Sequence, residues 1–392
     1  MKKLYILFAF LSLTLSSCAS VPTKAVCVIP IADLVGEQKH ASLAALPIAH
    51  KRFDGPARVH QLLYNEIVEI HEISGREARI KIPQLFYETN SSSSPQQFYW
   101  TSKHNLRPLS LLAKKGIPLS IFPQPLTCNQ DSFEQALYNT VSLTKPFFDS
   151  QTQTTFSAGT RFVVKGARRN HVVISFFDRR TNSLRVCSLP KNICLVHQQE
   201  NPQDRLRIFV DVVKTWAHLN TGFVPYVWGG CSVGSLCKKD QFVQENGIFT
   251  REELPTNKPQ PGLDCAGLIA RAAHLAGIPY FYKNSLTIAK HLAPLNKKET
   301  ISEGDIIWLP GHVMVVSSLK DNLLVEARHY SHGYGKVHEI PLSHQFKNIN
   351  SYEQLAAHFF NKKPLQRLDK SGKVVQVLPD FKILKLASVW RN

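Results

Sequence analysis

The chain has 392 residues, of which 43% are hydrophobic and 19% are charged. This composition excludes a wholly disordered, collagen-like or coiled-coil chain, and the length allows two or three domains of roughly 150 residues. Lysine and arginine number 47 against 29 aspartates and glutamates, so the net charge is +18. We therefore expect an anionic partner such as a membrane surface, a cell-wall polymer or nucleic acid. Charge alone does not choose among these three.

The N-terminus has the features of an export signal. Two lysines precede the apolar run Leu4 to Leu15, which is shorter than the roughly 20 residues of a transmembrane helix. The Leu-Ser-Ser-Cys sequence that follows resembles a bacterial lipobox, which implies that residues 1–17 are a signal peptide and that Cys18 carries a lipid. Ala19 resembles the residue found in lipoproteins sorted to the outer membrane. We expect a periplasmic, lipid-anchored protein without a nucleic-acid partner; an ordinary secretory signal is the alternative.

Eight cysteines occur in the sequence. If Cys18 is lipidated, an odd number remains, so at least one thiol is unpaired within the chain. Cys231 could pair with Cys237, and Cys187 with Cys194, although spacing does not decide connectivity. No Cys-x-x-Cys pair occurs, and we predict neither a metal site nor a cofactor.

The first half of the mature chain predicts a small β-domain. Residues 18–50 show no sustained hydrophobic period and are interpreted as a lipid anchor and lead-in. Residues 51–125 contain β-rich runs on either side of a turn at Gly75 and then an aromatic cluster with Tyr99 and Trp100. This pattern resembles a bacterial SH3-like β-barrel. The two aromatic residues belong either to the wall of a substrate cleft or to the barrel core, and the sequence leaves both open.

A second β-rich stretch, residues 126–203, predicts another and more degenerate SH3-like barrel. Its strand-like runs are Thr160–Val164 and His171–Phe177, whereas Asp131–Val141 has a more helical pattern. The segment after this stretch, Leu206–Leu219, carries apolar residues at spacings of three and four. Such spacing predicts an amphipathic helix.

Four short motifs then follow in a fixed order. They are Tyr-Val-Trp-Gly-Gly from Tyr226, Gly-Leu-Asp-Cys-Ala-Gly-Leu from Gly262, Gly-Asp-Ile-Ile-Trp from Gly304, and Gly-His-Val-Met-Val from Gly311. Each is weak alone, but the ordered set resembles the NlpC-type family of cell-wall cysteine peptidases. The resemblance covers residues 204–392. It implies an α+β fold class, with a papain-like peptidase domain preceded by two small SH3-like barrels.

Cys265 opens a segment with helical spacing and is therefore predicted in the first turn of a helix. Backbone amides and the helix dipole stabilise a thiolate there, and a neighbouring imidazolium lowers the thiol pKa further. We predict a thiolate nucleophile, against the alternative of a small buried hydrophobic residue. His312 leads a buried-strand run after a Pro-Gly turn and is the predicted general base and acid.

A third residue must orient the imidazole through its other nitrogen. Glu326, on the strand after the next turn, matches the position at which the family often has histidine. Its carboxylate can accept the imidazole proton. His329 lies on the opposite face of that strand by alternation and is the second candidate.

The resemblance also implies substrate contacts. Tyr226 would place its hydroxyl near the nucleophile, and Ser285 matches a substrate-side serine. Asp264 would bind a free α-amino group of the substrate, although an aspartate at a helix start can equally be a cap. Ala266 departs from the serine that follows the nucleophile in these relatives. Residues 231–261 form an insertion, which we expect to act as a lid or a partner contact.

We therefore expect a hydrolase of peptidoglycan-derived peptides. The resemblance implies cleavage of the γ-D-glutamyl–diamino acid bond in peptides with a free N-terminal L-alanine, whereas the residues alone imply only amide or ester cleavage. A non-catalytic lipoprotein that binds the wall or a division complex is the alternative, and Ala266 and Glu326 are the departures that favour it. Acyl transfer on lipids is a third and weaker hypothesis.

Overall fold

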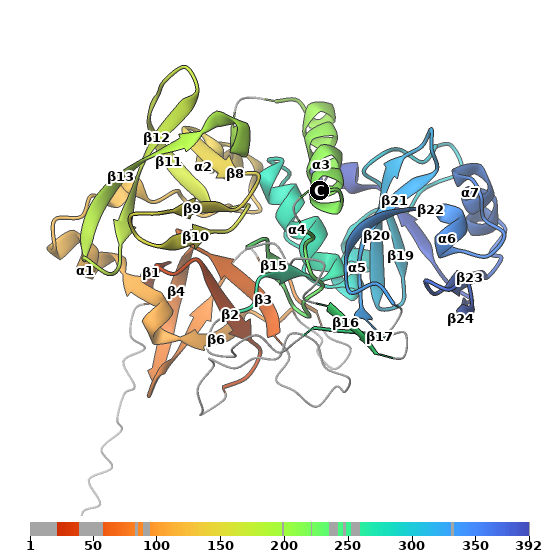
Figure 1. Cartoon of the computed structure of the whole chain (residues 1–392), viewed down its shortest axis with the longest axis horizontal. Helices are drawn as coiled ribbons and strands as arrows, with labels where there is room; N and C mark the ends of the chain where they lie inside the picture. The colour runs from red at the N-terminus through yellow and green to blue at the C-terminus, as the bar shows by residue number, and fades with distance from the viewer. Residues whose placement is uncertain are drawn as a thin grey trace, which may run out of the picture.

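The computed structural model describes residues 22–38, 58–82, 85–88, 95–197, 200–220, 222–234, 242–245, 248–251, 259–330 and 333–391. These residues form a mixed α/β structure. Two β-sheet units lie at one end of the molecule, and a helix-and-sheet unit formed by the C-terminal half lies at the other (Figure 1). None of the helices in the described ranges combines the length and the apolar character needed to span a bilayer.

The first unit is a seven-stranded antiparallel sheet with the order β3-β2-β6-β5-β4-β1-β7. Its strands are β1 (Thr23–Cys27), β2 (Ile31–Val35), β3 (Arg58–Leu63), β4 (Ile67–Ser74), β5 (Glu77–Lys81), β6 (Phe98–Ser102) and β7 (Leu106–Pro108). Gly75 adopts a φ of 57° in the turn between β4 and β5, as its place in the sequence predicts. Alternating residues of these strands, such as Leu34 and Ile80, form the core of the unit.

The expected bounds of this unit need correction, and its expected closed barrel is not confirmed. The sheet begins at Thr23, so the segment 18–50 holds two strands of the domain as well as a lead-in; each has five residues, which is too short to show a sustained period. The pairings among the described residues leave β3 and β7 as sheet edges, so the closed barrel is not confirmed. Tyr99 is fully buried in the core, where its hydroxyl donates to the Gln96 carbonyl (2.8 Å). It therefore does not form a cleft wall.

The second unit contains a five-stranded antiparallel sheet with the order β13-β12-β11-β8-β14 and a separate two-stranded sheet. The helix α1 (Leu109–Lys114) follows β7 and packs against β1 and β7 of the first sheet. The elements of the second unit are α2 (Gln130–Leu137), β8 (Thr140–Leu143), β9 (Phe147–Asp149), β10 (Thr154–Phe156), β11 (Arg161–Ala167), β12 (His171–Asp178), β13 (Ser183–Pro190) and β14 (Cys194–Val196). The predicted helix after Asp131 ends at Leu137, because Asn139 turns the chain with a φ of 55°. Cys187 and Cys194 are free thiols, so they do not form the disulfide that their spacing allows.

The third unit packs helices α3 and α4 against a five-stranded antiparallel sheet with the order β22-β21-β20-β19-β25. Its helices are α3 (Pro202–Ala217), α4 (Cys265–Leu275), α5 (Ser285–His291), α6 (Leu342–Gln345) and α7 (Tyr352–Phe360). Its main strands are β19 (Ile306–Leu309), β20 (His312–Ser318), β21 (Leu323–Arg328), β22 (Lys336–Pro341) and β25 (Lys382–Leu384), and a further pair is β23 (Leu365–Leu368) with β24 (Val374–Leu378). The amphipathic helix predicted after residue 205 is α3, whose buried face includes Phe209 and Trp216.

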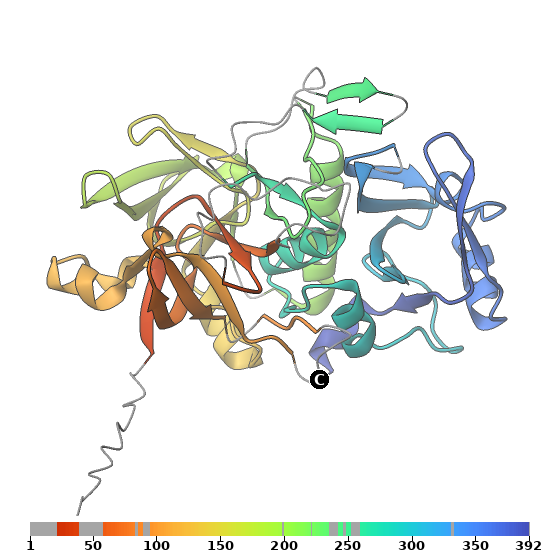
Figure 2. The same ribbon diagram turned by 90° about the horizontal axis from the view of Figure 1, so that it is seen from below.

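The described part of the insertion 231–261 contains short strands. β15 (Cys231–Ser232) pairs with β18 (Gly262–Leu263), and β16 (Phe242–Glu245) pairs with β17 (Ile248–Arg251). The β16–β17 hairpin projects from the rest of the ribbon (Figure 2). Cys237 lies outside the described residues, so its pairing with Cys231 stays a prediction.

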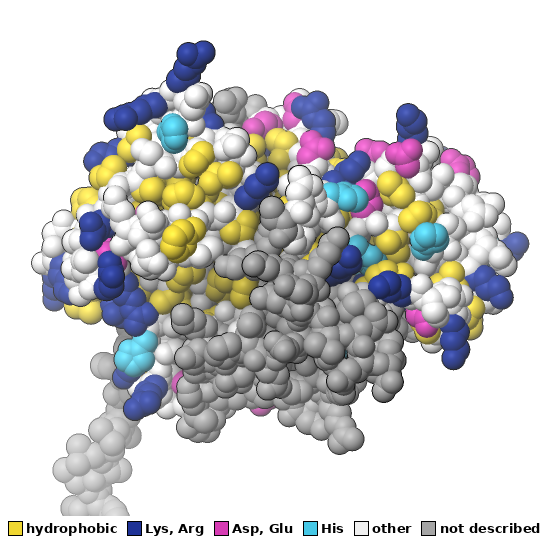
Figure 3. All heavy atoms as spheres, in the orientation of Figure 1, with side chains coloured by type: hydrophobic (Ala, Val, Ile, Leu, Met, Phe, Trp, Pro, Cys, Tyr) yellow, Lys and Arg dark blue, Asp and Glu magenta, His cyan; other side chains and the backbone are white. Residues whose placement is uncertain are grey.

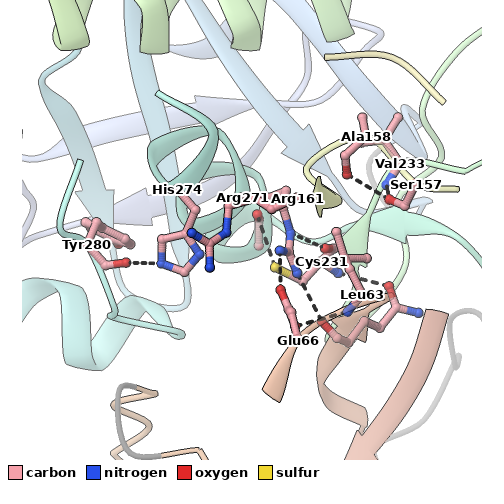
Figure 4. A network of polar contacts seen from close by, with 12 residues as sticks. Leu63, Glu66, Ser157, Ala158, Arg161, Cys231, Val233, Arg271, His274 and Tyr280 are labelled. Atoms are coloured by element: carbon pink, nitrogen blue, oxygen red, sulfur yellow. Dashed lines mark hydrogen bonds and ion pairs between the residues drawn. The ribbon is translucent and has the colours of Figure 1, made fainter. Parts of the chain in front are cut away.

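A buried guanidinium joins α4 to the first sheet (Figure 4). The Nε of Arg271 donates to the Cys231 carbonyl (2.8 Å), and its Nη2 donates to the Gln61 carbonyl (3.2 Å). Its Nη1 forms an ion pair with Glu66 (2.7 Å). Because Arg271 is only 2% exposed, loss of the carboxylate would leave a buried charge uncompensated. The first unit thus helps to fix the position of α4.

Candidate active site

The helix α4 begins at Cys265, as the sequence predicts. Asp264 is its N-cap residue, and the carboxylate accepts a hydrogen bond from the Gly267 amide (2.5 Å). The helix is held in place by apolar residues at helical spacing, including Leu268 and Ile269, which are buried in the core of the unit. The cap and the core together present the Cys265 side chain at the helix N-terminus.

The thiol environment differs from the prediction. Burial, together with the negative charge of Asp264, raises the pKa of the Cys265 thiol to about 12. Hydrogen bonds from the Val313 and Ala266 amides and the charge of Lys283 act in the opposite direction but do not outweigh burial. The pKa of the Cys265 thiol is thus raised in the free protein, whereas the sequence analysis expected it to be lowered. The sequence shows the helix start but not the desolvation of the sulfur.

His312 leads β20 and faces a buried carboxylate. Gly311 turns the chain between β19 and β20 with a φ of 80°, which places His312 at the start of the strand. Its Nε2 lies 2.6 Å from Oε2 of Glu326 on β21. Burial lowers the pKa of His312 to about 4, and the charge of Arg367 contributes, so the ring is neutral at pH 7. Since the carboxylate accepts a hydrogen bond from Nε2–H, the lone pair of the neutral ring lies on Nδ1.

Glu326 is fully buried and has several further polar neighbours. These are His338 Nε2 at 3.1 Å, Gln345 Nε2 at 3.4 Å, Arg328 Nη1 at 3.5 Å and Arg367 Nη2 at 3.5 Å. Burial alone would raise the pKa of Glu326, but the hydrogen bonds from His312 and His338 and the charge of Arg328 hold it well below its ordinary value. The carboxylate therefore stays ionised and orients the imidazole.

Of the two candidates for the third residue, the structure brings Glu326 and not His329 to His312. The ring of His329 instead packs edge-on against Tyr226, with the centroids 5.1 Å apart. The sequence analysis did not identify His338. This residue lies directly opposite Glu326 in the register of β21 and β22, so pairing of these two strands would have pointed to it. Arg367 comes from the distant β23, which no local pattern links to Glu326.

Asp264 has a partner that the sequence analysis missed. Lys283 Nζ lies 3.0 and 3.1 Å from the two carboxylate oxygens, and its side chain is fully buried. Burial would lower the pKa of Lys283, but the charge of Asp264 raises it, so the ammonium is retained. Asp264 is thus a helix cap and one half of an ion pair, and its side chain is 16% exposed. A substrate ammonium at this carboxylate would share it with Lys283.

Tyr226 and Ser285, the two further predicted substrate contacts, have different environments. Tyr226 is buried, and burial together with the nearby Cys265 thiol raises its pKa well above the ordinary value. Ser285 begins α5, and its carbonyl accepts a hydrogen bond from the Trp308 indole (2.7 Å). Trp100 lies next to the buried Tyr99 on β6, where it pairs with Arg79 on β5.

The high thiol pKa predicts slow modification of Cys265. At pH 8, iodoacetamide should alkylate the exposed Cys128 faster than Cys265, because only the thiolate reacts. Raising the pH towards 10 should accelerate modification of Cys265 progressively. Peptide-resolved mass spectrometry measures both sites in one sample. Rapid alkylation of Cys265 at neutral pH would contradict a protonated resting thiol.

Comparison with known proteins supports the fold. An NlpC/P60 family protein from Bacillus cereus superimposes with a TM-score of 0.51 at 16% identity, over 84% of this chain and 96% of that chain. The fold is similar to that of an NlpC/P60 protein. NlpC2 from Trichomonas vaginalis gives a TM-score of 0.32 at 12% identity, over 82% of this chain and 93% of that one. The peptidoglycan hydrolase RipB from Mycobacterium tuberculosis gives a TM-score of 0.24 at 25% identity, over 36% of this chain and 62% of that chain. No protein-family model and no curated protein matches the sequence.

Proposed function

We propose that the protein is a cysteine peptidase that hydrolyses peptidoglycan stem peptides at the γ-D-glutamyl–diamino acid bond. Cys265 is the nucleophile, His312 the general base and acid, and Glu326 the residue that orients the imidazole. The observation that carries the proposal is the buried contact between His312 and Glu326, with the Cys265 sulfur hydrogen-bonded to the amide of the residue after His312. The likeness of the fold to an NlpC/P60 protein supports the same reading.

The proposed reaction starts from a neutral thiol and a neutral imidazole. Nδ1 of His312 takes the thiol proton as the Cys265 sulfur attacks the amide carbonyl. The C–N bond then breaks, and the imidazolium gives that proton to the leaving amine. Water, deprotonated by the same ring, hydrolyses the thioester and regenerates the thiol. The Glu326 carboxylate stabilises the imidazolium in both halves of the reaction.

The proposed preference for peptides with a free N-terminal amine can be tested directly. We propose that Asp264 binds the free N-terminal ammonium of L-alanine beside Lys283, because one carboxylate has lone pairs for both cations and is partly exposed. The free tripeptide L-alanyl-γ-D-glutamyl-diaminopimelate should be cut at least about tenfold faster than its N-acetylated analogue, since an interaction with a charged group contributes about 1.5–3 kcal/mol.

Mass spectrometry of the released dipeptide measures both rates, and the matched comparison changes only the amine. Equal rates would leave Asp264 as a helix cap and the partner of Lys283, without a role in specificity. The cleavage chemistry would stand in that case, because Cys265 and His312 do not depend on this contact.

One observation favours the non-catalytic alternative, in which the protein binds the wall without cutting it. The raised pKa of the Cys265 thiol is typical of a buried structural cysteine. A protein of this kind would sediment with isolated wall and release no new amines, whereas the peptidase releases them.

For location, we propose that the protein is periplasmic and tethered to the outer membrane by a lipid on Cys18, which lies outside the described residues. The sequence of residues 1–19 supports this proposal. Globomycin-sensitive processing of the parent and loss of lipid labelling in a Cys18→Ser variant would be the expected results.

A further inference from the structure

A groove of about 500 Å³ lies on the first unit, far from the candidate active site. It runs between strands β4 and β7, the helix α1 and Asn182 at the tip of the β12–β13 hairpin. Five of its lining residues are basic in type: Lys103, His104, Arg107, Lys114 and Lys115. The described residues that line it include no aspartate or glutamate.

Among the described residues, no ion pair with a carboxylate involves the lysine and arginine side chains of this groove. Burial and the nearby positive charge of Arg179 both lower the pKa of Arg107. Lys115 reaches the neutral side-chain oxygen of Asn182 (3.4 Å) rather than a carboxylate. Lysine and arginine side chains gather at the end of the molecule where α1 lies (Figures 1 and 3). The groove therefore suits an anionic ligand.

Apolar side chains lie among these cations. Leu111 on α1 and Ile73 on β4 both line the groove, and each is 50% exposed. Leu119, just after α1, is 41% exposed. A soluble polyanion would form ion pairs with the basic residues but would not bury the exposed leucine and isoleucine side chains. A phospholipid surface accommodates both, with phosphates at the cations and apolar side chains at the acyl boundary.

The path of the chain brings the N-terminal segment to the same place. β1 pairs with β4 and with β7, the two strands that line the groove. Thr23, the first residue of β1, follows Cys18 by five residues, which span at most roughly 17 Å when extended. The apolar run Leu4–Leu15 precedes it. An N-terminus that enters or is tethered to a bilayer therefore holds this groove close to the lipid.

We propose that the groove around α1 docks the protein on a bilayer surface that contains anionic phospholipids. Lys103, Arg107, Lys114 and Lys115 contact the lipid phosphates, and Leu111 and Ile73 enter the acyl boundary. The strands β23 and β24 lie at the opposite end of the molecule from α1 (Figure 1), so a protein docked in this way extends its C-terminal unit away from the lipid.

The test uses the chain from residue 18 onwards with Cys18→Ser, so that neither a lipid modification nor the apolar run Leu4–Leu15 contributes to binding. Cosedimentation is measured with vesicles of phosphatidylcholine and with vesicles that contain about one third phosphatidylglycerol. We expect tighter binding to the anionic vesicles, weakened by salt. Lys114→Gln with Lys115→Gln should weaken it roughly 25-fold, because each basic residue near an anionic surface contributes about fivefold.

The matched control is Lys297→Gln with Lys298→Gln, which removes the same charge from exposed residues of the C-terminal unit. Its affinity for the anionic vesicles should be within about twofold of that of the parent. Leu111→Ser should weaken binding without changing its dependence on salt. An unchanged melting temperature for each variant shows that the fold is intact.

Three results would overturn the proposal: equal binding to neutral and anionic vesicles, equal losses for the two double variants, or binding of soluble polyphosphate in place of anionic vesicles. Peptide cleavage is assayed separately on a soluble tripeptide. An inactive protein that still docks would refute the proposed function and leave this inference standing.

Discussion

The Cys265→Ala variant should release no dipeptide from purified stem peptides, with a rate at least about 10⁴-fold below that of the parent. The thioester cannot form without the sulfur, and no neighbouring group replaces it. The helix should be unaffected, because alanine is a good helix former and Asp264 still caps the N-terminus. Liquid chromatography with mass spectrometry of the products measures the loss.

Cys128→Ala is the matched control, because it removes another thiol at an exposed position. It should keep the activity of the parent. Full activity in the Cys265 variant would end the peptidase proposal. If the parent itself sediments with isolated wall and releases no amines, the binding function is the correct one.

Glu326→Gln should impair both catalysis and stability. The amide lacks the charge that stabilises the imidazolium, so kcat should fall by about 10²–10⁴-fold. It also leaves Arg328 and Arg367 without their buried anion, and breaking a buried ion pair costs about 3–5 kcal/mol of folding free energy. Stopped assays on the tripeptide and urea unfolding measure the two effects.

Asp380→Asn removes an exposed carboxylate from the same unit and should leave both kcat and the free energy of unfolding unchanged. A Glu326→Gln protein that keeps the parent's kcat would show that the carboxylate does not assist the imidazole. A loss of activity without a loss of stability would place the role of Glu326 in catalysis alone.

Local pattern was sufficient for the central elements of the site. Helical spacing after Cys265 predicted α4, and the apolar run after His312 predicted β20. Strand alternation distinguished Glu326 from His329, and the structure brings Glu326 to the imidazole. These features depend on residues close in sequence, so a single sequence contains the information.

The remaining features depend on contacts between distant segments. Lys283 reaches Asp264 from 19 positions away, and Arg367 reaches Glu326 from 41. The thiol pKa depends on how completely the folded chain desolvates the sulfur, which spacing does not report. Strands β1 and β2 were missed because short strands whose residues are buried on both faces show no clear alternation.

The guanidinium of Arg271 has a consequence for how this protein can be divided. A fragment that starts at residue 204 would keep all four sequence motifs, yet it would lose the carboxylate of Glu66 and the carbonyl of Gln61. The C-terminal half is therefore not expected to fold as an independent domain. Any chimera that grafts it onto another N-terminal domain must also transplant the β3–β4 corner that receives this arginine.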